Sequence, residues 1–264
     1  MKEAGRGEDG ARRALEQIRG ELGSDFQVRI VEDLFYLAAE GEEKAMESAS
    51  ATIRRMVGHL YAVYFSRRPT EPVRIYCFKD GVSYAAYVRR AYGREPSTPY
   101  GYYLSAERKT ILNLGTGTGT LAHELVHPLI AEDFPSVPAW FNEGFASLFE
   151  HSYTAEDGSI KSRVNWRHRD LRRAMSEGRE IAIGKLMETN TDEFYGDEAG
   201  VNYATARYFC MYLERKNLLA AFYREFRATA AADRTGKKAL EKITGTKLAQ
   251  FEKDWRAWAA GLRP

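Results

Sequence analysis

Residues 119–150 of the chain read GTLAHELVHPLIAEDFPSVPAWFNEGFASLFE, two apolar segments joined by a connection that contains two prolines. The first segment carries the motif HELVH at residues 123–127. Its apolar neighbours predict a helix, and residues four apart on a helix lie on the same face. The two imidazoles of this motif can therefore hold one metal ion between them.

Zinc accepts histidine nitrogens at about 2.0–2.1 Å, and we expect His123 and His127 to be zinc ligands. Glu124 projects about 100° away from His123 around the helix, beside the metal rather than on it. There it can act as a general base toward a water molecule that the metal activates. The alternative is an ordinary amphipathic helix with two surface histidines, but unpaired histidines would be costly to bury in so apolar a segment.

Two histidines and a water molecule leave zinc in need of a third protein ligand. Asp133 lies ten residues after His123, where the metzincin pattern HExxHxxGxxH places its ligand. That pattern requires glycine for a tight turn at the position that Ile130 occupies. Glu143 lies in the second apolar segment, which reads as a helix able to return against the first and offer a carboxylate. Glu143 is therefore the preferred third ligand, with Asp133 as the alternative.

The rest of the chain predicts an α+β organisation. Strands are predicted over residues 26–30 and 73–78, and a hairpin over residues 100–114. Helices are predicted over residues 42–64 and 82–92, and the chain after the hairpin is mostly helical by period. We expect the sheet-bearing part and the helical part to pack together.

Composition excludes several classes of protein. The 264 residues carry a formal net charge of only +2, which argues against a dedicated nucleic-acid binder. No run of about 18 apolar residues is present, so no transmembrane segment is expected. Cys77 and Cys210 are too few for a cysteine-based zinc site. We expect both to be buried free thiols, while a single disulfide between them stays open.

No signal peptide is recognisable at the start of the sequence. As it stands, the chain is expected to be cytoplasmic. An exported protein whose leader is missing before Met1 is the alternative, and the sequence does not separate the two. It gives no indication of the oligomeric state.

HELVH followed by WFNEGFASLFE resembles the gluzincin metallopeptidases, the group that includes thermolysin and aminopeptidase N. The string WFNEGFA is similar to the aminopeptidase N sequence around its glutamate ligand, and the wider layout resembles the bacterial peptidase MA-like domains. The resemblance implies zinc bound by His123, His127 and Glu143, with Glu124 as general base and acid. It also implies a zincin-like fold: a small N-terminal mixed sheet with helices, then the active-site helix and a mostly helical C-terminal half.

On this basis the chain divides into three parts. We expect residues 1–24 to form a flexible or peripheral leader. Residues 25–151 would form an α+β half that contains the HExxH helix and the glutamate-ligand helix. Residues 152–264 would form a helical half packed on the site.

Three features depart from the aminopeptidase N pattern. Only 15 residues separate His127 from Glu143, a shorter spacing than in aminopeptidase N. No segment like GAMEN, which would anchor a free amine, precedes the motif, so exopeptidase and endopeptidase action both stay open. Pro128 follows the second histidine directly, where it is predicted to kink or end the helix.

Further residues are expected to complete the site. Relatives place a tyrosine after the glutamate ligand to stabilise the oxyanion, and Tyr203 is the first candidate, with Tyr208 second. Glu150 lies seven residues after Glu143 and is expected to orient the histidine ligands. Residues 110–114 are expected to form an edge strand that pairs with the substrate backbone. Arginines over residues 163–173 read as a solvated face or as the rim of a site for an anionic substrate.

Two functions remain open. The first is a zinc-dependent metallopeptidase that hydrolyses peptide bonds in a peptide or protein substrate. The second is a zinc-stabilised peptide-binding module of the same fold that has lost turnover. The intact Glu124 favours the peptidase, because a purely structural zinc site has no need of a base.

Overall fold

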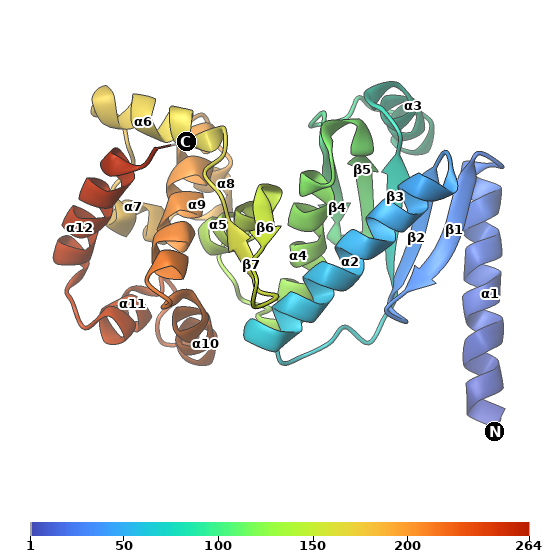
Figure 1. The fold of residues 1–264 in the computed structure, drawn as a ribbon, viewed down its shortest axis with the longest axis horizontal. Helices are drawn as coiled ribbons and strands as arrows, with labels where there is room; N and C mark the ends of the chain where they lie inside the picture. The colour runs from blue at the N-terminus through green and yellow to red at the C-terminus, as the bar shows by residue number, and fades with distance from the viewer. Residues whose placement is uncertain (1, 264) are drawn as a thin grey trace. The chain divides into compact units, whose positions relative to one another are not determined.

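The computed structural model describes residues 2–263, and the side chains of residues 9–263. A five-stranded mixed sheet with helices comes first, and a mostly helical half follows it, which confirms the predicted α+β class (Figure 1). The chain forms two compact units. The first contains the chain up to Gly58 and Arg68–Pro128, and the second contains His59–Arg67 and the chain from Leu129 onward.

The sheet of the first unit has the strand order β1-β2-β3-β5-β4. Strands β2, β3 and β5 run parallel to one another, whereas β1 is antiparallel to β2 and β4 is antiparallel to β5. The strands are β1 (Phe26–Val31), β2 (Phe35–Glu40), β3 (Val73–Phe78), β4 (Gly101–Leu104) and β5 (Lys109–Asn113).

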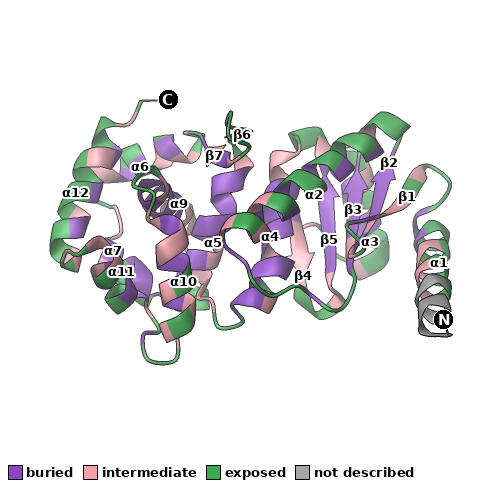
Figure 2. Cartoon of the chain, turned by 60° about the horizontal axis from the view of Figure 1, so that its bottom comes forward, coloured by how far each residue is buried: buried purple, intermediate pink, exposed green. Residues whose placement is uncertain are grey.

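Strand β2 has no counterpart among the strands predicted from the sequence. Five of its six residues are buried, because a strand inside a parallel sheet is covered on both faces. Its sequence FYLAAE therefore lacks the alternation of apolar and polar residues that marks a half-exposed strand. Figure 2 shows β2, β3 and β5 as the buried strands of the sheet.

The expectation that residues 110–114 form an edge strand is wrong. Strand β5 pairs with β3 on one side and with β4 on the other, so its own backbone groups are already used. The outer position belongs to β4, the other arm of the predicted hairpin. The hairpin itself was predicted correctly, but its periodicity does not say which arm faces inward.

Three helices come before the HELVH helix along the chain: α1 (Lys2–Leu22), α2 (Glu43–Val63) and α3 (Gly81–Tyr92). Helix α1 buries Ile18 and Leu22 in an apolar cluster that includes Tyr87 and Val88 of α3. Helix α3 begins after Asp80, whose carboxylate accepts hydrogen bonds from the first-turn backbone amides.

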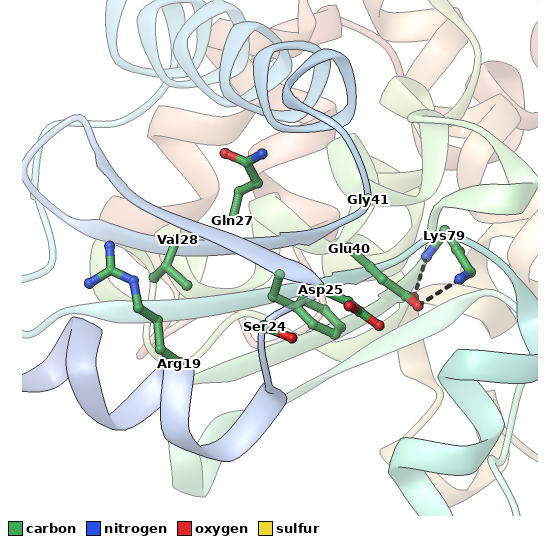
Figure 3. Close-up of a pocket in the computed structure, with 9 residues that line it drawn as sticks. Arg19, Ser24, Asp25, Gln27, Val28, Glu40, Gly41 and Lys79 are labelled. Carbon is green, nitrogen blue, oxygen red and sulfur yellow. Dashed lines mark hydrogen bonds and ion pairs between the residues drawn. The ribbon is translucent and has the colours of Figure 1, made fainter.

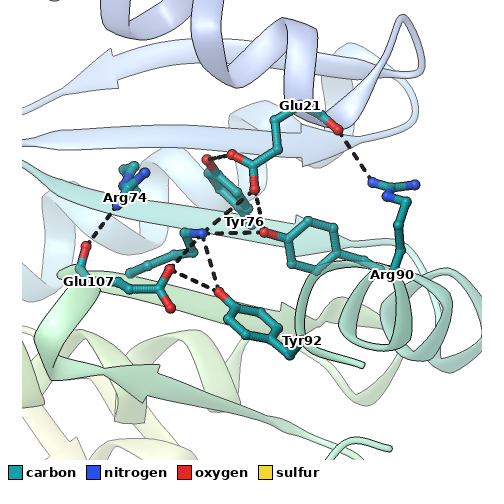
Figure 4. Close-up of polar contacts among 8 residues, drawn as sticks. Glu21, Arg74, Tyr76, Arg90, Tyr92 and Glu107 are labelled. Carbon is teal, nitrogen blue, oxygen red and sulfur yellow. Dashed lines mark hydrogen bonds and ion pairs between the residues drawn. The ribbon is translucent and has the colours of Figure 1, made fainter. Parts of the chain in front are cut away.

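A partly buried polar network joins α1 to the sheet (Figure 4). The Glu21 carboxylate accepts hydrogen bonds from the hydroxyls of Tyr76 at 2.7 Å and Tyr87 at 2.5 Å. Lys109 of β5 lies 2.8 Å from Glu107 and 3.6 Å from Glu21. Burial by itself raises the pKa of Glu21, but the two tyrosine hydrogen bonds and the Lys109 charge hold it below its ordinary value.

The second unit is built around α9 (Ala199–Arg215), which Figure 2 shows largely buried together with α5 (Ala139–Ser147). At Gly144 of α5 an added Cβ would lie 2.6 Å from the backbone oxygen of Ala206, so only glycine permits this close approach of α5 to α9.

The remaining elements are β6 (Ser152–Thr154), β7 (Ile160–Ser162), α6 (Arg167–Ser176), α7 (Ile183–Glu188), α8 (Thr191–Phe194), α10 (Leu219–Thr229), α11 (Lys237–Thr244), α12 (Leu248–Gly261) and the 3₁₀ turns η1 (Ser105–Glu107), η2 (Leu114–Thr116) and η3 (Leu148–Glu150).

Helix α4 (Gly119–Asp133) carries the HELVH motif and continues past Pro128. Of the two effects expected of this proline, a kink or an end of the helix, the end does not occur. Pro128 removes one backbone hydrogen bond, but the fully buried Leu129 and Ile130 hold the following turn against the core. None of the described helices is long and apolar enough to cross a membrane.

Asp133 at the end of α4 is buried and has its own set of hydrogen-bond donors. Its Oδ1 accepts from the backbone amides of Ser66 at 2.7 Å and Arg67 at 2.8 Å. Its Oδ2 accepts from the Tyr223 hydroxyl at 2.7 Å and from Arg227 at 2.5 Å. Burial by itself raises the pKa of Asp133, but these hydrogen bonds outweigh it and leave the pKa below its ordinary value.

We expect Asp133→Asn to lower the free energy of unfolding at pH 7 by about 3 kcal/mol, because Arg227 loses its buried counter-charge. A depressed pKa in the folded protein means that the carboxylate stabilises the fold above its unfolded pKa of about 3.9 and loses this effect as pH falls further. The difference between wild type and variant should therefore be constant from pH 7 to pH 5 and shrink below about pH 4.

Urea denaturation in the presence of a chelator measures this difference. Asp170→Asn removes a half-exposed carboxylate from α6 and should change stability by no more than about 0.5 kcal/mol. A loss of equal size in both variants would contradict the role assigned to Asp133.

Candidate metal centre

Helix α4 brings His123 and His127 together on one face, as the motif predicts. Their ring centroids are 5.0 Å apart and their planes are inclined at 73°. The His123 side chain is buried, and that of His127 is nearly so. Two imidazoles at this separation can direct one nitrogen each toward a common point.

Glu143 supplies a carboxylate from α5 and is 5% exposed. The ligand atoms of His123, His127 and Glu143 all lie within 4.8 Å of one another. Two ligands that are each about 2.1 Å from one zinc ion can be at most about 4.2 Å apart, so small side-chain rotations bring the three onto one ion. The structure therefore contains a buried group of two histidines and one glutamate that could bind a metal ion.

The donor set matches zinc. Two neutral imidazoles and one carboxylate form a common protein ligand set of catalytic zinc sites, which leave the fourth position for water or substrate. The carboxylate of Asp133, the alternative third ligand, already accepts hydrogen bonds from the donors described above. The structure thus favours Glu143 over Asp133.

Glu124 lies beside the histidines on α4. Its Oε2 is 3.9 Å from Nε2 of His127, and the residue is 8% exposed. The carboxylate is therefore held next to the candidate metal group in a site with little water. This is the position expected of a general base.

Tyr195 contacts the third candidate ligand. Its hydroxyl donates a hydrogen bond of 2.6 Å to Oε1 of Glu143. The residue follows α8, a short helix that starts with a capping box between Asn190 and Glu193. At the other end of α8, the side-chain amide of Asn202 from α9 donates a hydrogen bond of 3.0 Å to the Phe194 carbonyl.

No pattern in the sequence identifies Tyr195. The residue lies 52 positions after Glu143 and belongs to no motif or helical face shared with it. With 16 tyrosines in the chain, only the return of α8 toward α5 distinguishes this one.

Tyr203 of α9 lies near the same carboxylate. The Arg167 guanidinium stands 4.7 Å from the centre of its ring. Burial, followed by the negative charge of Glu143, raises the pKa of Tyr203 far above its ordinary value. The hydroxyl therefore keeps its proton and can donate a hydrogen bond.

Tyr208, the second candidate oxyanion donor, is fully buried, and its hydroxyl is hydrogen-bonded to the backbone of Asn165. Its hydroxyl accepts from the Asn165 amide at 3.2 Å and donates to the Asn165 carbonyl at 3.4 Å. These contacts tie α9 to the segment before α6. The choice of Tyr203 over Tyr208 as the oxyanion donor stays a prediction.

Glu150 ends η3 and is held by an arginine and an amide. Its carboxylate accepts from Arg167 Nε at 3.0 Å and Nη2 at 2.7 Å, and from Asn165 Nδ2 at 2.9 Å. These bonds orient Arg167, which in turn covers Tyr203. The expectation that Glu150 orients the histidine ligands stays a prediction.

The other three histidines have separate surroundings. His59 accepts a hydrogen bond from the Ile160 amide at 3.3 Å, and burial lowers its pKa to about 4. Nδ1 of His151 lies 2.9 Å from the Val164 carbonyl. His168 is buried against α12, and this burial lowers its pKa. None of the three belongs to the candidate metal group.

The two cysteines are free and buried, so the disulfide alternative is wrong. Burial raises the pKa of the Cys77 thiol to about 12. The pKa of Cys210 is also raised by burial. Both thiols therefore stay protonated and unreactive near neutral pH.

A polar cavity of about 530 Å³ lies between the end of α1 and the β1–β2 hairpin of the first unit (Figure 3). Arg19, Asp25, Glu40 and Lys79 are among the residues that line it. Glu40 and Lys79 form an ion pair of 3.2 Å. The mixed charges on this wall indicate no particular ligand.

A scan against models of known protein families gives no match, and a search of curated proteins finds no significant relative. The interpretation of the site therefore depends on its own geometry and donor set.

Removal of a candidate ligand should abolish zinc binding. Purified wild-type protein is expected to contain about one zinc ion per chain, whereas His127→Ala and Glu143→Ala should contain almost none. Elemental analysis after dialysis measures the content. His151→Ala removes a histidine outside the group and should keep the metal, so equal metal loss in this control would contradict the assignment.

Tyr195→Phe should weaken zinc binding about tenfold, because the carboxylate of Glu143 loses the hydrogen bond that orients it. Competition with a chromophoric chelator gives the dissociation constant independently of any activity. Tyr153→Phe removes a tyrosine hydroxyl from β6 and serves as the matched control. An unchanged affinity in Tyr195→Phe would show that the hydrogen bond does not support the metal group.

Proposed function

We propose that this protein is a zinc-dependent metallopeptidase of the gluzincin type, with His123, His127 and Glu143 as zinc ligands. The observation that carries the proposal is the buried His₂Glu group with a second carboxylate, Glu124, 3.9 Å from one of its histidines. A metal site with a neighbouring base is suited to hydrolysis, and a structural site requires no base. The resemblance of HELVH and WFNEGFA to the gluzincins supports peptide bonds as the substrate.

The residues divide the chemistry among them. When bound, zinc supplies Lewis acidity and lowers the pKa of water toward about 7. Glu124 accepts a proton from the attacking water molecule as the new carbon–oxygen bond forms. It then delivers that proton to the leaving amide nitrogen as the carbon–nitrogen bond breaks.

Tyr203 is the proposed donor to the oxyanion that develops on the scissile carbonyl oxygen. Its raised pKa keeps the phenol protonated, so that it can donate a hydrogen bond where negative charge forms. The Arg167 guanidinium lies over its ring, 4.7 Å from the ring centre. Glu150 takes part indirectly, through the two hydrogen bonds with which it holds Arg167.

Strand β4 is the proposed site for the substrate backbone. Among the described strands it ends the sheet beside β5, so an extended peptide can add to its outer side. This replaces residues 110–114, which lie inside the sheet. Both β4 and the two histidines belong to the first unit.

Glu124→Gln should leave zinc content near one ion per chain and lower the hydrolysis rate by about 10²–10⁴-fold, because the neutral amide cannot accept the proton. Digestion of a peptide library, read by mass spectrometry with and without a chelator, measures the rate and separates endo- from exopeptidase action. Glu132→Gln, near the end of the same helix, is the control. Full activity in Glu124→Gln would contradict the mechanism.

The same experiment distinguishes the second candidate function, a zinc-stabilised binding module, from a peptidase. A zinc-stabilised binding module would retain library peptides without cleaving them, in both the wild type and Glu124→Gln. Cleavage that depends on zinc and on Glu124 would exclude it.

A further inference from the structure

The second unit contains a cavity of about 750 Å³ that the proposed mechanism does not use. This volume is typical of sites that bind small molecules or single side chains. The cavity lies between the end of η3 and the beginning of α6. The lining residues are Glu150, His151, Val164, Asn165, Trp166, His168, Arg169 and Arg172.

Part of the cavity wall is apolar and open to solvent. Trp166 is 54% exposed, whereas Trp140 and Trp255 are almost completely buried. An indole left open on a cavity wall offers a large flat surface to an apolar ligand group. Val164 continues this surface. The wall is therefore suited to an aromatic or aliphatic side chain.

The rim of the cavity is cationic. Arg169 and Arg172 both line it with exposed side chains. The contact of Arg169 with Asp170 is long, at 3.8 Å, and the side chains are 86% and 46% exposed, so this ion pair is weak. The beginning of α6 adds the positive end of a helix dipole.

Glu150 does not cancel this positive charge. Its carboxylate is already paired with Arg167 through two hydrogen bonds of 3.0 Å and 2.7 Å. His168 is neutral near pH 7, because burial lowers its pKa. The cavity thus combines an apolar wall with two arginines, and guanidinium groups bind carboxylates in a two-pronged geometry.

The cavity is connected to the candidate metal ligand within the second unit. Glu150 follows Glu143 by seven residues along α5 and η3. Arg167 contacts both Glu150 and the ring of Tyr203. A ligand in the cavity would therefore lie beside Glu150, which holds the arginine that covers Tyr203.

We propose that this cavity binds an apolar residue that carries a carboxylate, namely the C-terminal residue of a peptide substrate. Trp166 contacts the side chain, and Arg169 and Arg172 bind the carboxylate. The assignment of this ligand as a substrate rests on the proposed peptidase function, whereas the recognition of the carboxylate does not.

The first experiment measures binding alone, on the full chain freed of metal by a chelator. N-acetyl-L-tryptophan should bind at least ten times more tightly than N-acetyl-L-tryptophan amide, which lacks the negative charge. The double variant Arg169→Glu, Arg172→Glu should lose this preference. Arg173→Glu is the matched control, because Arg173 is exposed on the same helix and pairs with Glu177 rather than lining the cavity.

Two results would contradict the proposed carboxylate-binding site. One is equal binding of the acid and the amide to the wild type. The other is an equal loss of binding in Arg173→Glu and in the double variant, which would indicate a general charge effect. Trp166→Ala should weaken both probes, while Trp166→Phe should restore most of the affinity. Because no metal is present, these outcomes are independent of peptidase activity.

The second experiment tests the assignment as a substrate site, on the zinc-loaded protein. Peptides that end in tryptophan with a free carboxylate should be cleaved with a KM about tenfold lower than their C-terminal amides. The double variant should remove that difference and leave the kcat on the amides unchanged. If the probes bind but free and amidated peptides have equal KM values, the cavity binds some other carboxylate and the substrate assignment is wrong.

Discussion

The contact between Gly144 and the backbone of Ala206 is the constraint on which the second unit depends. Helix α5 approaches α9 so closely that a Cβ at residue 144 would overlap the Ala206 carbonyl. Glu143 is the preceding residue, so the same contact sets where its carboxylate lies. Tyr203 belongs to α9, and Tyr195 directly follows α8, the short helix packed beside it. One close helix–helix contact therefore places a candidate ligand and both tyrosines around it.

Buried carboxylates are distributed so that each has its own donors. Asp133 is paired with Arg227 and accepts hydrogen bonds from four other donor groups, and Glu150 accepts from Arg167 and Asn165. Glu143 differs, because its ligand oxygen lies within 4.8 Å of the ligand nitrogens of His123 and His127, and Tyr195 donates a hydrogen bond to its carboxylate. The geometry thus singles out Glu143, among these acids, as the one suited to a metal.

Local patterns predicted the helices whose two faces differ, over residues 42–64 and 82–92, because one face is buried and the other is not. The hairpin over residues 100–114 was found from its turn signal, although every residue of β5 is buried. Strand β2 was missed because both of its faces are covered. The order of β4 and β5 was misjudged because pairing partners come from distant parts of the chain. Pro128 did not end α4, since the packing of Leu129 and Ile130 outweighs one lost hydrogen bond.

The sequence by itself determined the two histidines, the neighbouring Glu124 and the preference for Glu143, because the spacing within one helix follows from its period. It also determined the α+β class. Only the tertiary structure decided that Asp133 is occupied elsewhere, that Tyr208 is tied to Asn165, and that Tyr195 reaches Glu143. It alone revealed the cavity beside Trp166. These features depend on contacts between residues dozens of positions apart, and a local period carries no information about such contacts.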